Sequence, residues 1–134
     1  MSIQSRIRYT VPADIQTVWR TVTSLTDYAW RSDLAKIERL DDTQFVEHTQ
    51  SGAATLFRVT QTQPPHLWAF DMENDYFSGH WTGRFTALDD NRTELDFAED
   101  ITLKKRLPRW LAKFYLYRQQ QRYRRDLCRK LQNV

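Results

Sequence analysis

The stretch Val11-Pro12-Ala13-Asp14-Ile15-Gln16-Thr17-Val18-Trp19 joins the end of a strand pattern to the start of an amphipathic helix. Pro12 has a fixed φ and no N–H to satisfy, so it suits the first turn of a helix, and Asp14 complements the positive end of the helix dipole. Apolar side chains then recur at the i, i+3, i+4, i+7 spacing, at Ile15, Val18, Trp19 and Val22. The pattern predicts a helix from about Pro12 to Thr23 whose apolar face another element must cover.

Alternating apolar and polar residues surround this helix on both sides. They predict a strand from Ile3 to Tyr9. After the helix, Ser24 or Thr26 can cap a second short helical turn through Asp27-Tyr28-Ala29-Trp30. Six further short runs follow, separated by turn formers, at Leu34–Leu40, Gln44–His48, Ala54–Thr62, Leu67–Glu73, Ser78–Leu88 and Thr93–Leu103. Short links between consecutive strands predict antiparallel hairpins.

The C-terminal segment predicts one long helix. Pro108 marks its start, and Arg109 to Leu131 contains neither Gly nor Pro, which suits about six helical turns. An antiparallel sheet has one apolar face, and only these helices can cover it. We therefore expect an α+β fold: a curved antiparallel sheet of about seven strands wrapped around the long helix, with two short helices after the first strand and an elongated cavity between sheet and helix.

Length and composition predict a single domain, residues 1–134, because a chain of this size buries one core. No apolar run approaches the roughly 20 residues of a membrane span. The first residues lack the apolar core of a secretory signal, so a cytoplasmic protein is expected. The lone Cys128 cannot form an internal disulfide, and its helical position favours an inert buried thiol.

The net charge of +3 is unevenly divided. Residues 1–103 have nine basic and sixteen acidic residues, whereas residues 104–134 have eleven basic residues against Asp126 alone. Four arginines recur every three or four positions along the last helix: Arg118, Arg122, Arg125 and Arg129. This face could attract an anionic membrane or bind an acidic protein. Alternatively, it could complement the acidic charge of residues 1–103 while the aliphatic parts of the arginine side chains cover apolar surface. Nucleic acid is not expected, because Tyr115, Tyr117 and Tyr123 are too few for base stacking.

Five short motifs follow one another in a distinctive order. They are Val11-Pro12-Ala13 with Val18-Trp19, Tyr28-Ala29-Trp30-Arg31-Ser32-Asp33-Leu34, Pro64-Pro65, Gly79-His80-Trp81 and Asn91-Arg92-Thr93. In this order they resemble the START-like SRPBCC superfamily of polyketide cyclases/dehydrases and lipid-transport proteins, over nearly the whole chain. The resemblance implies a helix-grip fold and a hydrophobic ligand. It does not imply one activity, because the superfamily includes enzymes, carriers and ligand sensors.

Glu99 is the candidate catalytic residue. It shares a strand face with Leu95, Phe97 and Ile101. A carboxylate in an apolar pocket either has a raised pKa, which suits general acid or base catalysis, or pairs with a cation such as Arg58, Arg84 or a helix arginine. The alternative is that Glu99 reaches solvent or forms a structural salt bridge with the last helix.

Aromatic residues supply the candidate ligand-binding set, for which the alternative is an ordinary packed core. The set comprises Tyr28, Trp30, Phe57, Trp68, Phe70, Trp81, Phe85, Phe97, Trp110, Phe114 and Tyr117. No metal and no cofactor are expected, because His48, His66 and His80 lack metal-ligand spacing and glycines are too few for a phosphate loop. Alternation places His80 away from the pocket.

Three hypotheses follow from the sequence. The first is a protein that binds or transports a small hydrophobic ligand between sheet and helix. The second is a cyclase/dehydrase-like enzyme that uses Glu99. The third is a peripheral adaptor whose basic helix docks on a membrane or an acidic partner.

Overall fold

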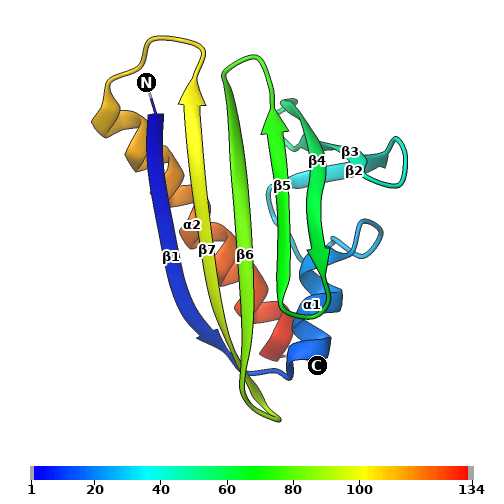
Figure 1. Ribbon diagram of the computed structural model, residues 1–134. Coiled ribbons are helices and arrows are strands. Elements are labelled where there is room, and N and C mark those ends of the chain that lie inside the picture. The colour runs from blue at the N-terminus through cyan, green and yellow to red at the C-terminus, as the bar shows by residue number, and fades with distance from the viewer. Residues whose placement is uncertain (1, 133–134) are drawn as a thin grey trace.

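The computed structural model describes residues 2–132, which form one seven-stranded antiparallel sheet and two helices (Figure 1). The strand order is β1-β7-β6-β5-β4-β3-β2. The strands are β1 (Ser2–Val11), β2 (Leu34–Arg39), β3 (Gln44–Thr49), β4 (Ala54–Gln63), β5 (Leu67–Glu73), β6 (Phe77–Asp89) and β7 (Arg92–Leu103). All seven predicted strands are confirmed, with ends that differ by at most two residues.

Helix α1 (Ile15–Thr23) begins later than predicted. Asp14 has extended backbone and acts as the N-cap: its Oδ2 accepts a hydrogen bond of 3.1 Å from the backbone N–H of Thr17. An N-cap residue lies outside the helix that it caps. The predicted start at Pro12 was therefore wrong, because the capping side chain and not the proline fixes the first turn.

The second short helix is absent from residues 24–30, and this prediction was wrong. Ser24 Oγ accepts hydrogen bonds from the backbone N–H groups of Thr26 and Asp27, at 3.3 and 3.0 Å. The N–H of Arg31 bonds to the carbonyl of Tyr28 in a single turn that is not continued. These local bonds satisfy the backbone in turns, so no helical ladder is needed.

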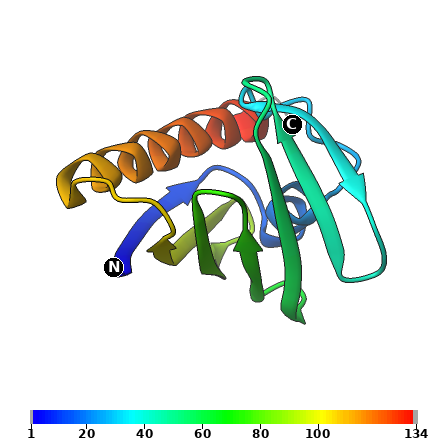
Figure 2. The ribbon, with the colours of Figure 1, turned by 90° about the horizontal axis from the view of Figure 1, so that it is seen from above.

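Helix α2 (Arg109–Gln132) crosses the concave face of the curved sheet (Figure 2). It packs against β1, and its C-terminal residues Leu127 and Leu131 enter the main core together with Val18 and Trp19 of α1. The sheet and the two helices therefore meet tightly at one end of the molecule. This arrangement is the helix-grip fold expected from the sequence.

Candidate functional site

A cavity of about 1480 Å³ lies between the concave face of the sheet and α2 and is open to solvent. Its wall on the sheet side consists of inward-facing residues of all seven strands, and tyrosine, glutamine, arginine and leucine side chains of α2 form the opposite wall. Among the lining residues are Tyr9, Phe57, Trp68, Phe70, Trp81, Phe97, Glu99, Leu116, Gln120 and Tyr123. The wall thus combines a large aromatic surface on the sheet with polar and charged side chains, among them Arg31, Glu47 and three glutamines of α2.

The structure separates the candidate aromatic residues into two groups. Eight of them line the cavity: Tyr28, Trp30, Phe57, Trp68, Phe70, Trp81, Phe97 and Tyr117. Phe85 lies deeper, buried against Trp19 of α1 with ring centroids 5.2 Å apart. Trp110 and Phe114 lie on exposed positions of α2. These three residues are outside the cavity wall.

Trp81 occupies the centre of the sheet wall because the neighbouring inward positions on β6 are glycines. A Cβ atom at Gly83 would lie 2.3 Å from Cη2 of Trp81, so the indole ring occupies the space that a side chain there would fill. The ring stacks on Phe70, with centroids 4.7 Å apart and planes 9° from parallel. The glycine therefore allows the indole to lie along the sheet and leaves the cavity open above it.

Glu99 lies in the cavity lining beside a polar side chain of α2. It pairs in register with Ser5 of β1 on one side and with Trp81 of β6 on the other. Gln120 Nε2 donates hydrogen bonds to Ser5 Oγ at 2.7 Å and, more weakly, to Glu99 Oε1 at 3.4 Å. Burial raises the pKa of Glu99, and the hydrogen bond from Gln120 opposes this shift only in part.

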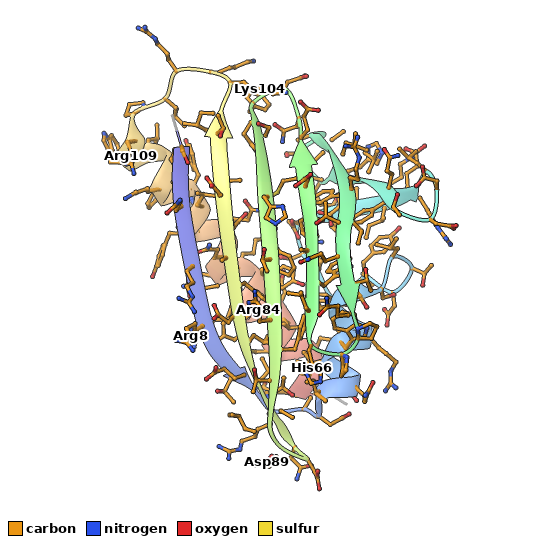
Figure 3. The ribbon with its side chains drawn as sticks, in the orientation of Figure 1. Arg8, His66, Arg84, Asp89, Lys104 and Arg109 are labelled. Atoms are coloured by element: carbon orange, nitrogen blue, oxygen red, sulfur yellow. The ribbon has the colours of Figure 1, made fainter. Side chains whose placement is uncertain are left out.

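No cation pairs with Glu99 among residues 2–132, so the salt bridge to the last helix, which the sequence left open as an alternative, is not formed. Arg84 lies on the opposite face of the sheet, as Figure 3 shows, together with Arg8. Arg58 is exposed on β4. The side chain of α2 that meets Glu99 is the neutral Gln120, and a neutral partner leaves the carboxyl without charge compensation.

Tyr9 contributes a polar group that the sequence did not reveal. Its side chain is buried in the cavity lining, and its hydroxyl has no hydrogen-bond partner among residues 2–132. Burial raises the pKa of Tyr9, and the guanidinium of Arg124 lies over its ring at 5.0 Å. The hydroxyl oxygen is itself sealed from solvent, so it is an unpaired polar group within the packed wall, and such groups are costly.

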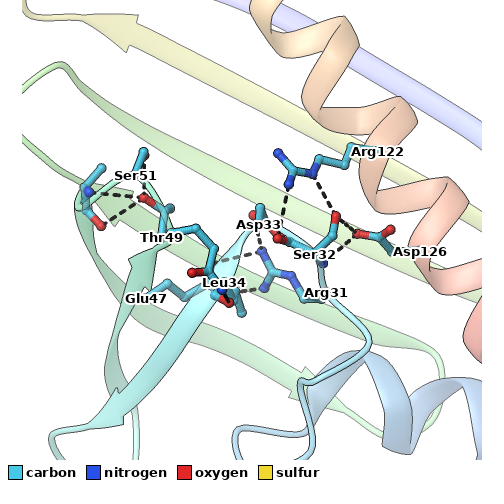
Figure 4. Close-up of polar contacts among 11 residues, drawn as sticks. Arg31, Ser32, Asp33, Leu34, Glu47, Thr49, Ser51, Arg122 and Asp126 are labelled. Atoms are coloured by element: carbon cyan, nitrogen blue, oxygen red, sulfur yellow. Dashed lines mark hydrogen bonds and ion pairs between the residues drawn. The ribbon is translucent and has the colours of Figure 1, made fainter.

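Arg31 holds together a buried ionic cluster at the cavity wall (Figure 4). Its Nη1 and Nη2 donate to the two carboxylate oxygens of Glu47 at 2.8 and 3.2 Å, and Nη2 also reaches Asp33 at 3.2 Å. The guanidinium lies 5.3 Å from the ring centroid of Tyr123. Burial alone would lower the pKa of Arg31, but the charge and hydrogen bonds of Glu47 outweigh it and hold the pKa above its usual range.

Ser32 connects the segment before β2 to α2 (Figure 4). Asp126 Oδ2 accepts hydrogen bonds from the backbone N–H and the hydroxyl of Ser32, at 2.8 and 2.7 Å. Arg122 donates to the hydroxyl and the carbonyl of Ser32, at 2.8 and 3.1 Å. Arg122 is therefore engaged within the fold, which the periodic spacing of the helix arginines did not reveal. The one signal for this contact was Asp126, the single acidic residue in a basic helix.

The histidines are separate from the cavity. Nδ1 of His80 lies 2.7 Å from Asp71 Oδ1 on the outer face of the sheet, which confirms that His80 points away from the pocket. Within residues 2–132, no group of three or more His, Cys, Asp or Glu side chains is placed to hold a metal ion. No helix in this part of the chain has the length and apolarity needed to cross a membrane.

The curved sheet, the long helix that it wraps around and the cavity between them define a START-like helix-grip protein. Residues 2–134 match the family described as polyketide cyclase / dehydrase and lipid transport, and the chain belongs to this family. No curated protein matches the sequence.

Several solved structures share the fold at low sequence identity. A START superfamily protein from Mycobacterium smegmatis is 14% identical, with a TM-score of 0.87 over 97% of each chain. The Zhui aromatase/cyclase from Streptomyces sp. R1128 is 15% identical, with a TM-score of 0.85 over 98% of this chain and 94% of that one. Norcoclaurine synthase from Thalictrum flavum, in complex with dopamine and hydroxybenzaldehyde, is 10% identical, with a TM-score of 0.70 over 99% and 88% of the two chains. At these identities the similarity shows the fold.

Proposed function

We propose that the protein binds a small, mainly hydrophobic molecule between the sheet and α2. The observation that carries this proposal is the open cavity of about 1480 Å³ with its aromatic wall. Ligand pockets are typically concave, lined by apolar and aromatic side chains, and equipped with a few polar groups that orient the ligand. The stacked pair Phe70 and Trp81 offers a flat apolar surface of this kind.

The polar groups of the wall narrow the class of ligand. Glu99 lies among apolar lining residues such as Trp81 and Phe97, and its hydrogen bond from Gln120 is long, at 3.4 Å. A ligand with one hydroxyl, carbonyl or amine on an apolar skeleton would bond to this carboxyl group, and a pure hydrocarbon would not. We therefore infer an amphipathic ligand, predominantly apolar.

A bulky substitution in the cavity wall tests the binding proposal. Leu116 is half-buried on α2 and lines the cavity. We expect the neutral probe N-phenyl-1-naphthylamine to gain fluorescence with the unaltered protein, and Leu116→Trp to weaken its binding at least about tenfold, because the indole occupies space that the probe needs. Fluorescence titration measures the dissociation constant.

Leu88→Trp is the matched control, because Leu88 is exposed at the end of β6 and lies outside the cavity lining. Its titration should match that of the unaltered protein. Equal loss in both variants, or no probe binding at all, would contradict the proposal. Native mass spectrometry of molecules that co-purify with the unaltered protein, and are missing from Leu116→Trp, would identify the ligand class.

A second candidate function is catalysis of the cyclase/dehydrase type, with Glu99 as general acid or base. The observation that favours it is a carboxyl group in the cavity wall whose burial raises its pKa and which has no cation beside it in residues 2–132. Such a shift brings a carboxyl closer to the pH at which it exchanges protons efficiently. Loss of turnover of a polyketide substrate in Glu99→Gln, with unchanged probe binding, would support this role.

Glu99→Gln also has an expected effect on stability. Because the pKa of Glu99 is raised in the folded protein, the folded state binds this proton more tightly than the unfolded chain, and stability decreases as the pH rises through this range. Glutamine has no charge to desolvate and can still meet Gln120. We expect the variant to be more stable than the unaltered protein at pH 8, with the difference vanishing at pH 4, in urea unfolding at both values.

Glu94→Gln is the control for this pH dependence. Glu94 lies on the outer face of the same strand, with Oε1 3.6 Å from Nη2 of Arg8, so it should show no gain in stability at pH 8. A destabilised Glu99→Gln whose deficit is the same at both pH values would contradict a desolvated Glu99.

A further inference from the structure

The N-terminal half of α2 has an aromatic stripe on its solvent-facing side. Trp110, Phe114 and Tyr117 follow at i, i+4 and i+7, so they lie along one side of the helix, opposite the buried Ala112 and the half-buried Leu116. Their exposed fractions are 71%, 48% and 60%. Large exposed aromatic side chains in a contiguous row indicate an interaction surface.

Basic residues flank this stripe. On the helical wheel Lys113 and Arg118 lie on either side of it, and Arg106 precedes the helix. Within residues 2–132 none of these three cations has a carboxylate at ion-pair distance. No acidic residue occurs from Lys104 to Arg125, and Asp126 is buried and bonded to Ser32. We call Arg106, Trp110, Lys113, Phe114, Tyr117 and Arg118 the aromatic–basic face.

We propose that the aromatic–basic face docks on the surface of an anionic phospholipid membrane. Tryptophan and tyrosine prefer the interfacial region of a bilayer, where the ring is in apolar surroundings and the polar tip remains hydrated. Lysine and arginine beside them gain from the negative surface potential of anionic lipids. A helix lying in the membrane plane with its aromatic side inserted satisfies both preferences at once.

The charge of this face argues against a second copy of the chain as its partner. A two-fold interface between identical faces would place Lys113 and Arg118 of one protomer near the same residues of the other. Like charges brought together in this way are unfavourable, and no acidic residue between positions 104 and 125 could compensate. A surface of phosphate and carboxylate groups offers the complementary charge over the whole length of the stripe.

The aromatic–basic face adjoins the cavity lining. Tyr117 and Arg118 belong to this face and also line the cavity, together with Tyr76, Leu107 and Tyr115. Figure 3 marks this end of the molecule with Lys104 and Arg109, where β7 leads into α2. Docking would therefore bring this part of the cavity lining close to the membrane surface, but the docking proposal does not depend on what the cavity binds.

The contacts of Arg122 place the docking surface nearer to the start of α2 than the arginine spacing suggested. Both Nε and Nη2 of Arg122 donate to Ser32, so this arginine is held against the segment before β2. The arginine row expected from the sequence, from Arg118 to Arg129, is therefore not a uniform solvated face. The exposed aromatic side chains lie instead beside Lys113 and Arg118, toward the start of α2.

Vesicle flotation tests the proposal with two double variants. We expect binding to phosphatidylcholine vesicles that contain phosphatidylserine, little binding to phosphatidylcholine alone, and release as the salt concentration rises. Trp110→Ala with Phe114→Ala should weaken binding at least about tenfold, because two inserted rings are lost. Arg106→Gln with Lys113→Gln, both outside the cavity lining, should weaken it about tenfold and reduce its salt dependence.

Matched pairs elsewhere on the surface are the controls. Leu40→Ala with Leu88→Ala removes exposed apolar side chains, and Arg20→Gln with Arg84→Gln removes exposed charges. Both pairs should bind vesicles like the unaltered protein. All four double variants should retain the unfolding midpoint and the uptake of N-phenyl-1-naphthylamine, which separates a failure of docking from a failure of ligand binding.

Three results would overturn docking by this face. The first is the absence of vesicle binding at low salt. The second is equal binding to neutral and anionic vesicles, or binding that is unchanged in Trp110→Ala with Phe114→Ala. The third is a dimer in sedimentation that this same double variant dissociates, which would assign the face to self-association.

Discussion

Arg31→Met is expected to reduce the free energy of unfolding by about 3 kcal/mol, because it leaves the carboxylates of Glu47 and Asp33 without their shared cation. Arg31 has a side chain that is 13% exposed, and it makes two hydrogen bonds to Glu47 and one to Asp33. Removing one partner of a buried ionic cluster costs more than the cluster contributes, because the remaining charges stay desolvated. Urea unfolding at neutral pH measures the loss.

Two comparisons separate this ionic effect from a general loss of packing. Arg39→Met removes an exposed arginine that pairs with Asp42, and its cost should be below about 1 kcal/mol. The double variant Arg31→Met with Glu47→Met should recover part of the stability lost in Arg31→Met, because one unpaired carboxylate is removed. If Arg31→Met and Arg39→Met lose the same small amount, the cluster around Arg31 is not structurally important.

Phe85→Ala is expected to cost about 3–5 kcal/mol, because it leaves a large void in the core. The side chain of Phe85 is 2% exposed and packs edge-on against Trp19 and Phe97, with centroid distances of 5.2 and 5.9 Å. It connects α1 to the sheet beneath the cavity wall. Denaturant unfolding measures the cost, and probe titration under folding conditions measures its effect on binding.

Phe114→Ala is the matched control, since it removes the same ring from an exposed position on α2. Its cost should be below about 1 kcal/mol. Because Phe85 lies outside the cavity lining, Phe85→Ala should retain binding of N-phenyl-1-naphthylamine wherever it is folded. A stable Phe85→Ala with abolished probe binding would instead place Phe85 in the ligand site, as the sequence suggested.

The strands were predictable because one face of the sheet packs against the core and the other face is in water, so apolar and polar residues alternate along each strand. Alternation between buried and exposed positions is strong on β7, where Leu95 and Phe97 face inward and Asp96 faces outward with Arg6. The same rule placed Glu99 on the inner face. Helix boundaries were less predictable, because Pro12 and Asp14 both suit a helix start and only the hydrogen bond to Thr17 decides between them.

Most of the polar contacts of the site could not be predicted from the sequence. Arg31 lies in the loop before β2, Glu47 in β3 and Tyr123 in α2, so their meeting depends on how α2 crosses the sheet. Gln120 was not distinguishable from the other glutamines of α2 until its contact with Glu99 was seen. Side-chain spacing along one element cannot predict contacts between elements distant in the chain. Asp126 is an exception, because a lone acidic residue in a basic helix can be recognised in the sequence as a candidate for such a contact.

The pairing of β1 with β7 has a consequence for the order in which the molecule assembles. Residues 2–11 form their ladder with residues 93–102, so the first strand has no neighbour in the sheet until residues 93–102 have been synthesised. The consecutive hairpins from β2 to β7 can form earlier, because their contacts are local. We expect nascent chains that end before residue 93 to expose the apolar side of β1 and to depend on chaperones, and release of α2 from the ribosome to be the step that encloses the cavity.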